Sequence, residues 1–591
     1  MAEQCTKQYK DPAVVRAEQG IDAPAEKKAG VEKLKRESNG FRGNVKKEML
    51  DESVPMVSED SYNLMKHFGM YQQDDRDTRN ERKRAGLDKD WSFMIRTKLP
   101  GGCATPEQYL ILDDIANNWS NGSLRITTRQ TIQFHGVGKL KLQSVVRALN
   151  SRLLTSYGAC GDVVRNVMNC PVADIDATPA YRGRQIFTEL TNVINARTLP
   201  RTSAFYDIFI NGEKDNELAP IARLRDEKED LYGDSYMPRK FKIGVTIPQD
   251  NCVDIFSHDL GIVALLENGF VKGYNILAGG GLGSSHGNKE TYPRISDPIC
   301  HVTPDEVIRA VDAVITIQRD YGNRTNRKRA RLKYVLDELG PEWFRAEMGR
   351  RMSRELPEAV AIPDSAWGFD DHLGWHEQIQ PGLFYVGIFI ENGRICDKNR
   401  EGIPMRTTLR GIVEKFRTQV RMTGQQNIIL ANIAEKHVAE ITKILNGSGL
   451  STGNGKLSTL RRNEISCVSL PTCGLALGEA ERVMPGVIDK LEEMGFGNER
   501  IMIRISGCPN SCSRAPMSEI GLIARAPGKY NLYIGGDYEG TRLNKLFKET
   551  VLLDELPNEI GRLITRWRAE RLQGEEFGDF CHRLGNEALL K

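Results

Sequence analysis

Arg125-Ile126-Thr127-Thr128-Arg129-Gln130-Thr131-Ile132 is echoed later in the chain by Arg421-Met422-Thr423-Gly424-Gln425-Gln426-Asn427-Ile428, with Arg, Thr, Gln and Ile matching at one constant offset of 296 residues. A second echo relates Tyr274-Asn275-Ile276-Leu277-Ala278-Gly279-Gly280 to Tyr530-Asn531-Leu532-Tyr533-Ile534-Gly535-Gly536 at an offset of 256. Two echoes in the same order predict a duplicated unit, in which each half supplies one wall of a shared site. Chance similarity between strand and turn segments is the alternative.

Outside these echoes the composition is that of an ordinary globular protein. The 591 residues include 82 Lys and Arg against 79 Asp and Glu, a formal charge of +3, which gives no reason to expect a nucleic-acid partner. The longest apolar runs, such as residues 262–266, are far shorter than the roughly 20 residues that cross a bilayer, so we expect no membrane span. The first fifty residues lack the apolar core of a signal peptide, which favours a cytoplasmic location.

Strand-like and helix-like segments are mixed along the chain. Residue content and periodicity predict strands at 208–210, 241–247 and 383–390 and helices at 307–319 and 408–416. Residues 318–333 also look helical, and their many basic side chains predict a charged outer face. Residues 1 to about 50 have few large apolar groups and are expected to form a poorly packed arm or a surface strap.

Four of the twelve cysteines are clustered, as Cys467-x5-Cys473 and Cys508-x3-Cys512. Four thiolates are what a 4Fe-4S cube needs when each iron takes one protein ligand. Pro and Gly residues beside both pairs would let backbone amides approach the cluster sulfurs. Structural zinc is the main competitor, although the x5 gap is wider than its usual spacing, and four unrelated buried thiols are the third reading.

Several cations have no obvious counter-ion in the sequence. Lys240 and Lys242 lie two apart in a strand-like run, so they would share one face and repel each other unless an anion lies between them. Arg96 precedes the turn at residues 99–102, and Arg165 lies in a possible loop. Taken singly, each of these is more readily a solvated surface charge, and only their convergence would indicate an anion site.

A second set of donors lies in residues 123–136. A strand there would present a row of side chains to a ligand rich in carboxylates, and the row consists of Arg125, Thr127, Arg129, Gln133 and His135. A lone histidine such as His135 is more often structural than a metal ligand. The glycines at 279–283 do not complete G-x-G-x-x-G, because His286 stands at the last position, so no dinucleotide site is expected.

Together these motifs resemble the sulfite and nitrite reductase family, and within it the haemoprotein (beta) subunits of assimilatory sulfite reductases. The resemblance runs from about Ser38 to Phe580. Its most specific pieces are Gly69-Met70-Tyr71-Gln72-Gln73-Asp74-Asp75-Arg76-Asp77, Arg129-Gln130-Thr131, the run Pro238-Arg239-Lys240-Phe241-Lys242 and the two cysteine pairs.

The resemblance implies two cofactors, sirohaem and a 4Fe-4S cluster. It implies that Cys467, Cys473, Cys508 and Cys512 hold the cluster and that Cys512 bridges it to the sirohaem iron. It places the substrate beside the candidate catalytic residues Arg96, Arg165, Lys240 and Lys242, and the sirohaem acid groups beside Arg125, Thr127, Arg129, Gln133 and His135.

The reaction implied by the resemblance is the six-electron reduction of sulfite to sulfide in assimilatory sulfur metabolism. Lys242 favours sulfite, since nitrite-reducing relatives tend to carry an uncharged residue there, whereas Gly161 departs from the asparagine of some sulfite reductases. Nitrite reduction to ammonia is the alternative reaction, and a four-cysteine zinc or iron-sulfur scaffold or electron-transfer subunit is the non-enzyme alternative. An NADPH-dependent flavoprotein subunit and ferredoxin both remain possible donors, and Leu373-Gly374-Trp375-His376 is similar to the ferredoxin-linked branch.

The expected fold class is α+β, with three domains, an internal pseudo-two-fold repeat and mixed sheets flanked by helices. Residues 1–60 are expected to form the N-terminal arm, and residues 61–157 with 372–450 a composite domain of two repeat halves. Residues 158–371 would form the sirohaem and substrate domain, and residues 451–591 the domain of the cluster and sirohaem.

Overall fold

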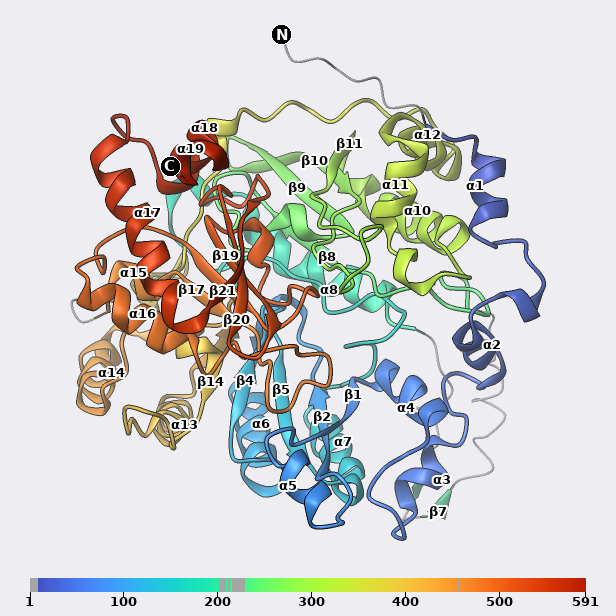
Figure 1. Ribbon diagram of the computed structural model, residues 1–591, viewed down its shortest axis with the longest axis horizontal. Helices are drawn as coiled ribbons and strands as arrows, with labels where there is room; N and C mark the ends of the chain where they lie inside the picture. The colour runs from blue at the N-terminus through green and yellow to red at the C-terminus, as the bar shows by residue number, and fades with distance from the viewer. Residues whose placement is uncertain (1–8, 201–208, 211–212, 215–228, 454–456, 591) are drawn as a thin grey trace.

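Four sheets carry the fold of the chain. A computed structural model describes residues 9–200, 209–210, 213–214, 229–453 and 457–590 (Figure 1). In hydrogen-bonded order, the first sheet consists of β1 (Met70–Asp74), β2 (Trp91–Arg96), β5 (Ile132–Val137), β4 (Leu124–Ile126) and β14 (Arg394–Ile395), and the second of β12 (Gly374–Glu377), β13 (Leu383–Ile388), β16 (Ile428–Ala434), β15 (Gln419–Met422) and β3 (Cys103–Ala104). The third consists of β11 (Asp297–Val302), β10 (Phe270–Ala278), β9 (Leu260–Glu267) and β8 (Ile243–Thr246), and the fourth of β17 (Glu464–Ser466), β18 (Ile503–Ser506), β19 (Ile520–Ala526), β20 (Lys529–Ile534) and β21 (Lys545–Leu552).

The first two sheets are repeats of each other and exchange a strand. The short strand β14, which comes from the second repeat in sequence, pairs with β4 of the first sheet, and β3, from the first repeat, pairs with β15 of the second sheet. Each sheet is therefore completed by a strand from the other half of the sequence. The duplication predicted from the octapeptide echo is confirmed.

The echoed octapeptides form the same hairpin twice. Gln130 and Gln426 both have positive φ, 56° and 70°, and close equivalent turns onto Thr127 and Thr423. The Gln130 side chain donates to the Met422 carbonyl at 3.3 Å, and the Gln426 side chain donates to the Ile126 carbonyl at 3.4 Å. Since 126 and 422 are also related by the offset of 296, these two hydrogen bonds are symmetry mates across the pseudo-two-fold axis.

The third and fourth sheets repeat each other too. In each, a parallel pair, β8 with β9 or β18 with β19, is followed by antiparallel pairing to β10 or β20. The second sequence echo falls on β10 and β20, each of which is followed directly by a glycine of φ 88°, Gly279 and Gly535. Their equivalent positions extend the duplication from one pair of sheets to both.

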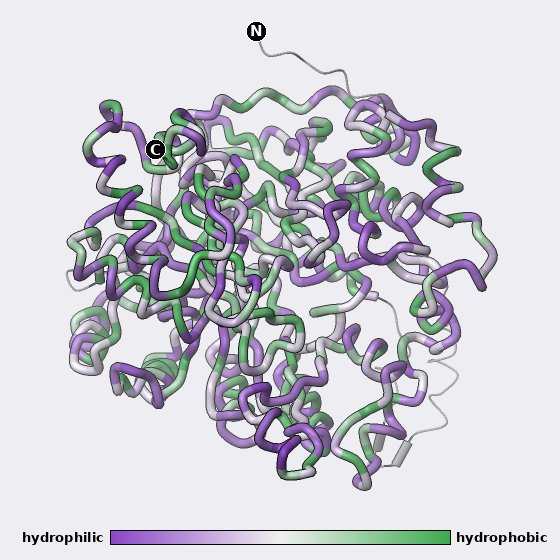
Figure 2. Tube along the Cα trace, in the orientation of Figure 1, coloured by the Kyte–Doolittle hydropathy of each residue, from purple (hydrophilic) through white to green (hydrophobic). Residues whose placement is uncertain are grey.

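Helices cover the outer faces of the sheets (Figure 1). Their bounds are α1 (Pro12–Glu18), α2 (Gly30–Glu37), α3 (Val45–Leu50), α4 (Glu59–Met65), α5 (Arg79–Arg84), α6 (Pro106–Trp119), α7 (Leu142–Asn150), α8 (Phe187–Arg197), α10 (Val307–Tyr321), α11 (Leu332–Leu339), α12 (Pro341–Met352), α13 (Met405–Phe416), α14 (Glu435–Ser448), α15 (Thr459–Arg462), α16 (Met484–Glu493), α17 (Leu556–Glu570), α18 (Phe577–Leu584) and α19 (Asn586–Leu590). Figure 2 shows hydrophilic residues along outer helices such as α5, none of whose residues is buried. No helix in the part of the chain described here is long and apolar enough to cross a bilayer.

Two hydrophobic cores lie between these elements. One extends from Val15 to Leu450 and contains side chains of the first three sheets, and the other extends from Leu460 to Leu589 around the fourth sheet. Local sequence signals set the helix positions that enclose them. For example, α6 begins at Pro106 after a capping box in which Thr105 and Gln108 each bond the other's backbone amide. The fourth sheet therefore has an apolar interior of its own.

Most expected elements are present with shifted ends. The strands expected at 241–247 and 383–390 are β8 and β13, and the helices expected at 307–319 and 408–416 lie within α10 and α13. Of the strand expected at 208–210, residue 208 lies outside the described residues, while Phe209–Ile210 pairs with Glu213–Lys214 as β6 and β7. The helix expected over 318–333 is wrong, because α10 ends at Tyr321 and an asparagine-capped turn follows before α11.

The described part of the N-terminal arm packs more tightly than expected. Val15 and Phe41 are fully buried in the first core. The buried Lys35 ammonium binds Glu32 at 2.7 Å and the carbonyl of Met237 at 2.7 Å. The first expectation, a poorly packed arm, is therefore wrong for this stretch, and the alternative of a surface strap fits it, because paired charges and a few apolar residues fix it to the body of the protein.

Candidate functional site

The four clustered cysteines lie at the carboxyl ends of two neighbouring parallel strands. Cys467 follows β17, and Cys508 and Cys512 lie in the loop after β18. Since parallel strands end at the same edge of a sheet, the two loops meet there. Cys473 turns back toward this edge, and its amide donates to the Ser469 carbonyl at 2.9 Å.

The thiols of this group affect one another and receive hydrogen bonds. The Gly507 amide donates to Cys467 Sγ at 3.2 Å, and the Asn510 side chain donates to Cys508 Sγ at 3.5 Å. Burial, and then the nearby Cys512 sulfur, raises the pKa of Cys467 well above its ordinary value and that of Cys508 to about 11. Such thiols become thiolates when a positively charged centre binds them.

The number and placement of the four cysteines fit a cluster. A 4Fe-4S cube takes four thiolates, one for each iron, and two neighbouring loops supply them here. A structural zinc ion with four sulfur ligands is the alternative.

A row of polar side chains crosses the first sheet beside the cysteine loops. Gln133 on β5 is paired in register with Arg96 on β2 and Arg125 on β4, so the three side chains share one face. With its amide oxygen turned toward Arg96, Gln133 accepts from Nη2 at 2.5 Å and from Nε at 3.1 Å. The structure therefore brings these three predicted residues together.

Arg125 is already paired inside the protein. Its Nε donates to Glu481 at 3.0 Å and its Nη2 to the Ser466 carbonyl at 3.1 Å, directly before Cys467. Glu481 also binds Arg394, the next residue of the row on β14. Sequence reasoning missed Glu481, because no local pattern indicates a partner 356 residues away.

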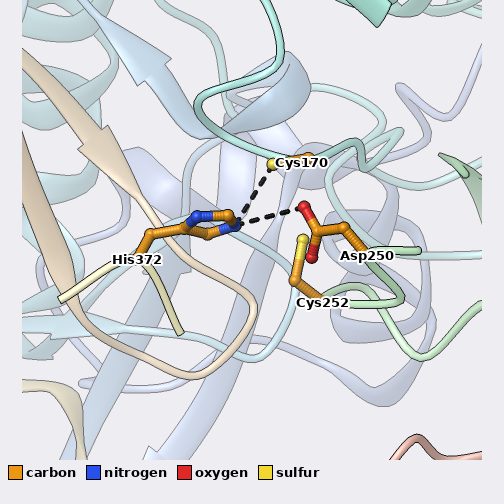
Figure 3. A group of neighbouring side chains, drawn as sticks. All are labelled: Cys170, Asp250, Cys252 and His372. Atoms are coloured by element: carbon orange, nitrogen blue, oxygen red, sulfur yellow. Dashed lines mark hydrogen bonds and ion pairs between the residues drawn. The ribbon is translucent and has the colours of Figure 1, made fainter. Parts of the chain in front are cut away.

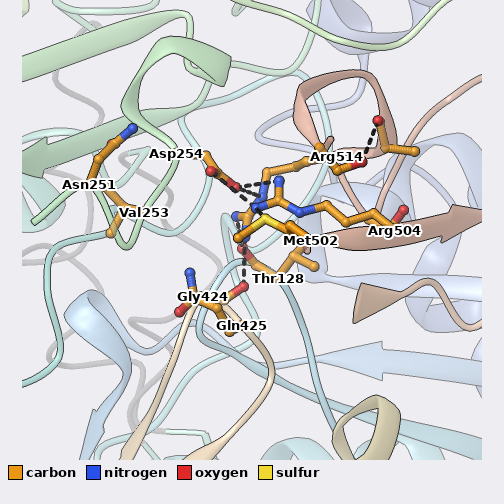
Figure 4. A network of polar contacts seen from close by, with 12 residues as sticks. Thr128, Asn251, Val253, Asp254, Gly424, Gln425, Met502, Arg504 and Arg514 are labelled. Atoms are coloured by element: carbon orange, nitrogen blue, oxygen red, sulfur yellow. Dashed lines mark hydrogen bonds and ion pairs between the residues drawn. The ribbon is translucent and has the colours of Figure 1, made fainter. Parts of the chain in front are cut away.

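The hairpin loop between β4 and β5 connects this row to Cys512. The Thr127 hydroxyl accepts from the amides of Arg129 and Thr131 and so closes the turn. The Thr128 hydroxyl donates to the Cys512 carbonyl at 2.9 Å. Figure 4 shows Arg514 beside Thr128 and Gly424, to whose carbonyls it donates at 2.9 and 2.7 Å, while Asp254 binds it on the other side. Arg514 thereby links both hairpins to the cysteine loop.

The cations Arg165, Lys240 and Lys242 lie together near this loop. Neither lysine ammonium has a hydrogen bond or ion pair with any residue that the structure describes. Burial, followed by Arg165 and Lys242, holds the pKa of Lys240 well below its ordinary value, and burial followed by Arg331 and Arg129 does so for Lys242. For Arg165, burial lowers the pKa, but Tyr71, Cys160 and Cys512 outweigh it and raise the pKa. The convergence that an anion site requires is present.

One carboxylate close to these cations is fully engaged. Asp259 accepts both a bidentate pair of bonds from Arg331, at 2.9 and 2.8 Å, and the Lys242 amide at 2.9 Å. Arg331 and Lys333 are buried, so the charged outer face predicted for this stretch is wrong for them. A bound anion would serve as the counter-ion that Lys240 and Lys242 lack among the described residues.

Unsatisfied polar atoms mark the same region. Arg129 Nε, Arg165 Nε and both ring nitrogens of His135 are buried without a hydrogen-bond partner among the described residues. Burial holds the pKa of His135 well below its ordinary value, so its ring is neutral and offers one donor and one acceptor. Buried donors without partners fit a ligand rich in carboxylates, which is the chemistry of sirohaem.

Gly161, the predicted departure from some relatives, is required by close packing. Its φ is 87°, and a Cβ there would lie 2.5 Å from His67 Cδ2. Cys160, which sequence reasoning did not single out, accepts from Arg96 Nη1 at 2.7 Å. Its position directly before Gly161 was the only signal that could have found it.

Comparison with known proteins agrees with this geometry. Residues 87–152 and 376–448 match the family model "Nitrite/Sulfite reductase ferredoxin-like half domain", and residues 160–356 match "Nitrite and sulphite reductase 4Fe-4S domain". The two half-domain matches fall on the two sheets that exchange strands. The fold is also that of the Mycobacterium tuberculosis NirA protein, with a TM-score of 0.73, 20% identity and 97% of both chains covered.

Curated relatives match nearly the whole chain. The chain is 41% identical over 569 residues to the "Sulfite reductase (NADPH) hemoprotein beta-component" of Geobacillus thermodenitrificans, covering 96% of this chain and 97% of that one. It is 42% identical to the protein of the same name from Anoxybacillus flavithermus, with the same coverage. On this identity and coverage, the chain belongs to the sulfite reductase haemoprotein beta-component family, within the nitrite and sulfite reductases.

Proposed function

We propose that this chain catalyses the six-electron reduction of sulfite to sulfide, using sirohaem and a 4Fe-4S cluster. The observation that carries the proposal is the group Arg165, Lys240 and Lys242, which has too few counter-ions and lies near Cys512. Lys240 and Lys242, whose ammonium groups form no ion pair with any described residue, suit a doubly charged oxyanion. The names and identity of the curated relatives support the same reaction.

We propose that Cys467, Cys473, Cys508 and Cys512 hold the cluster, with Cys512 shared with the sirohaem iron. Cys512 is the exposed member of the four, and its sulfur influences the other three thiols and Arg165. Bound there, the two cofactors would supply single electrons and an iron that binds sulfur. Arg129, Gln133 and His135, together with Arg125 and Thr127, would hold the sirohaem acid groups.

The lysines and arginines have different tasks in this scheme. Each oxygen that leaves sulfite departs as water and needs protons, while the charge of the substrate needs a fixed counter-ion. A bound anion favours the protonated forms of Lys240 and Lys242, whose pKa values burial and neighbouring cations otherwise depress, so these side chains can pass protons to the departing oxygens. Arg165, whose pKa is raised, stays charged and, with Arg96, orients the anion.

We further propose an NADPH-dependent flavoprotein as the electron donor and the cytoplasm as the location. The names of the relatives include NADPH, while this chain lacks a dinucleotide motif. All eleven cysteines in the described ranges are free thiols, which is the state a reducing compartment maintains. We also propose the division into an arm at 1–60, a composite domain of 61–157 with 372–450, and domains at 158–371 and 451–591, which the exchanged strands and the separate core around the fourth sheet support.

Reconstituted turnover tests these proposals together. Purified chain mixed with sulfite, NADPH and a flavoprotein reductase should form sulfide, and the chain with NADPH alone should not oxidise the nucleotide. Ferredoxin reduced by dithionite is the competing donor, and nitrite is the competing substrate. Sulfide formation with ferredoxin but not with the flavoprotein would refute the donor, and ammonia formation without sulfide formation would refute the reaction.

A further inference from the structure

Two cysteines outside the cluster occupy the positions that correspond to cluster ligands in the other repeat. Residues 243–246 and 503–506, which form β8 and β18, and their partners beginning at 260 and 520 are related by an offset of 260. The same offset relates Cys252 to Cys512. Met168 pairs with Gly244 in the way that Ile465 pairs with Arg504, so Cys170 corresponds to Cys467.

This second position carries a compact set of metal-ligating side chains. Ligand atoms of Cys170, Asp250, Cys252 and His372 all lie within 4.8 Å of one another, and all four residues are buried (Figure 3). His372 Nε2 is 3.3 Å from both Cys170 Sγ and Asp250 Oδ2. A tetrahedral zinc ion with sulfur at about 2.3 Å and nitrogen or oxygen at about 2.0 Å places such ligand pairs roughly 3.3–3.6 Å apart.

We propose that Cys170, Asp250, Cys252 and His372 bind one zinc ion, separate from the iron cluster and independent of the proposed reaction. The mixed set of two sulfurs, one nitrogen and one oxygen suits zinc. The same set does not suit a 4Fe-4S cube, which takes four thiolates at wider spacing. With four protein ligands the site is closed, as structural zinc sites are.

The side chains around the four ligands fit a metal centre. The Asp370 carboxylate lies 3.7 Å from His372 Nδ1, on the side of the ring away from the other ligands; this is too long for a hydrogen bond but places a negative charge behind the ring. Asp250 Oδ1 is buried and has no hydrogen-bond partner among the described residues. A cation bound at Oδ2 would lower the cost of burying this carboxylate, whose second oxygen has no partner among the described residues.

The neighbouring Arg184 balances the charge. Two thiolates, one carboxylate and Zn²⁺ leave a net charge of −1. The fully buried Arg184 guanidinium lies 3.2 Å from Cys170 Sγ and 2.5 Å from Asp250 Oδ2, so it supplies the compensating positive charge. Arg184 donates hydrogen bonds to Cys170 and Asp250, and the four ligand atoms still face one another.

The ion would connect segments that are distant in sequence. Cys170 lies in the loop after the Val164 and Met168 bridges, Asp250 and Cys252 follow β8, and His372 precedes β12 of the second sheet. The Cys252 carbonyl also accepts from Gln425, in the second hairpin. The zinc ion therefore joins the third sheet to the second repeat, as the cysteine loop and Arg514 join the fourth sheet to the first repeat.

Metal analysis of the holoenzyme tests the site. Wild-type enzyme is purified, incubated with Zn²⁺ and desalted. Elemental mass spectrometry should then find one zinc per chain in addition to the iron. Zinc K-edge absorption should show two sulfurs at about 2.3 Å and two lighter ligands at about 2.0 Å. Cys252→Ser, His372→Gln and Asp250→Asn should each lose the zinc while keeping the iron and the visible spectrum.

Cys300→Ser is the matched control, since Cys300 is a buried free thiol on β11 outside the group. It should keep the zinc. Wild-type enzyme without zinc above background would overturn the proposal, and so would a disulfide between Cys170 and Cys252. A zinc edge with four sulfurs would also overturn it, because it would place the ion at the cluster cysteines. The edge measurement needs no variant, so a substitution that prevents folding does not weaken the test.

Discussion

Replacing Lys242 with asparagine should impair sulfite reduction more than nitrite reduction. At about 4 Å, two unit charges attract by about 4 kcal/mol at an effective dielectric constant of about 20 and by about 1 kcal/mol in water. Lys242 is half-buried, so we take about 2 kcal/mol for each unit of anion charge. Dianionic sulfite then loses about 4 kcal/mol and nitrite about 2 kcal/mol, a roughly 30-fold difference in kcat/KM.

The protonation of Lys242 adds a pH dependence to this prediction. Burial and neighbouring cations hold its pKa well below the ordinary value in the free enzyme, and a bound anion raises it. Binding therefore takes up protons, and sulfite should bind more weakly as the pH rises through the depressed pKa. The free energy of protonating Lys242 is the same whichever substrate binds. It therefore reduces the loss in kcat/KM by the same factor for sulfite and for nitrite, and the ratio of the two losses does not change.

The assay compares kcat/KM for sulfite and nitrite with a chemical electron donor, at a pH where sulfite is the dianion. Lys272→Asn is the matched control, because Lys272 is exposed and pairs with Glu267 at the protein surface. It should change neither substrate. Lys242→Arg should have a KM close to that of the wild type but a lower kcat, since arginine keeps the positive charge and does not release its proton. Equal losses for sulfite and nitrite in Lys242→Asn would refute the electrostatic reasoning.

Three further outcomes are expected. Cys512→Ser should abolish the spectroscopic coupling between haem and cluster, and a wild-type spectrum with wild-type turnover would refute its bridging role. Gly161→Asn should lower the thermal midpoint, because a Cβ there would lie 2.5 Å from His67 Cδ2 and overpacking of this kind costs about 1–3 kcal/mol, whereas an unchanged midpoint would contradict the packing argument. Burial raises the pKa of Glu481, but Arg394 and Arg125 outweigh it and lower the pKa to about 2. Ionised Glu481 therefore stabilises the folded state by up to about 3 kcal/mol above pH 4.5, and this contribution is lost as the pH falls toward 2. Denaturant unfolding across that range should show this loss in wild type, and the same slope in Glu481→Gln would rule out Glu481 as its source.

The sequence predicted what depends on local pattern or on repetition. The octapeptide echo predicted the duplicated sheets, and the even spacing in residues 123–136 predicted that Arg125 and Gln133 share a face. The sequence did not place Arg96 beside them, because that neighbour comes from the pairing of β2 with β5. It could not predict that Glu481 binds Arg125, because that pair depends on how two distant segments dock. The basic stretch at 318–333 shows the same limit. Its burial is decided by Asp259 and by backbone carbonyls that no helical periodicity reveals.

The zinc ligands illustrate the limit most clearly. Cys170, Cys252 and His372 have no motif spacing, and they read as scattered residues in the sequence. Their relation becomes visible only when strand pairing gives the offset that superimposes one repeat on the other. Offsets of 296, 256 and 260 differ because loops of different length separate the elements, which is why a single shift of the sequence finds only fragments of the duplication.

The exchange of β3 and β14 has a consequence for how the protein is made on the ribosome. When β5 has been synthesised, its sheet still lacks the strand that begins at Arg394, and at 5–20 residues per second that strand emerges roughly 10–50 s later. During this interval the open edge of β4 is exposed in the nascent chain. Neither of the two exchanged sheets can be completed alone, so the first sheet cannot take its final form until the strand that begins at Arg394 has left the exit tunnel.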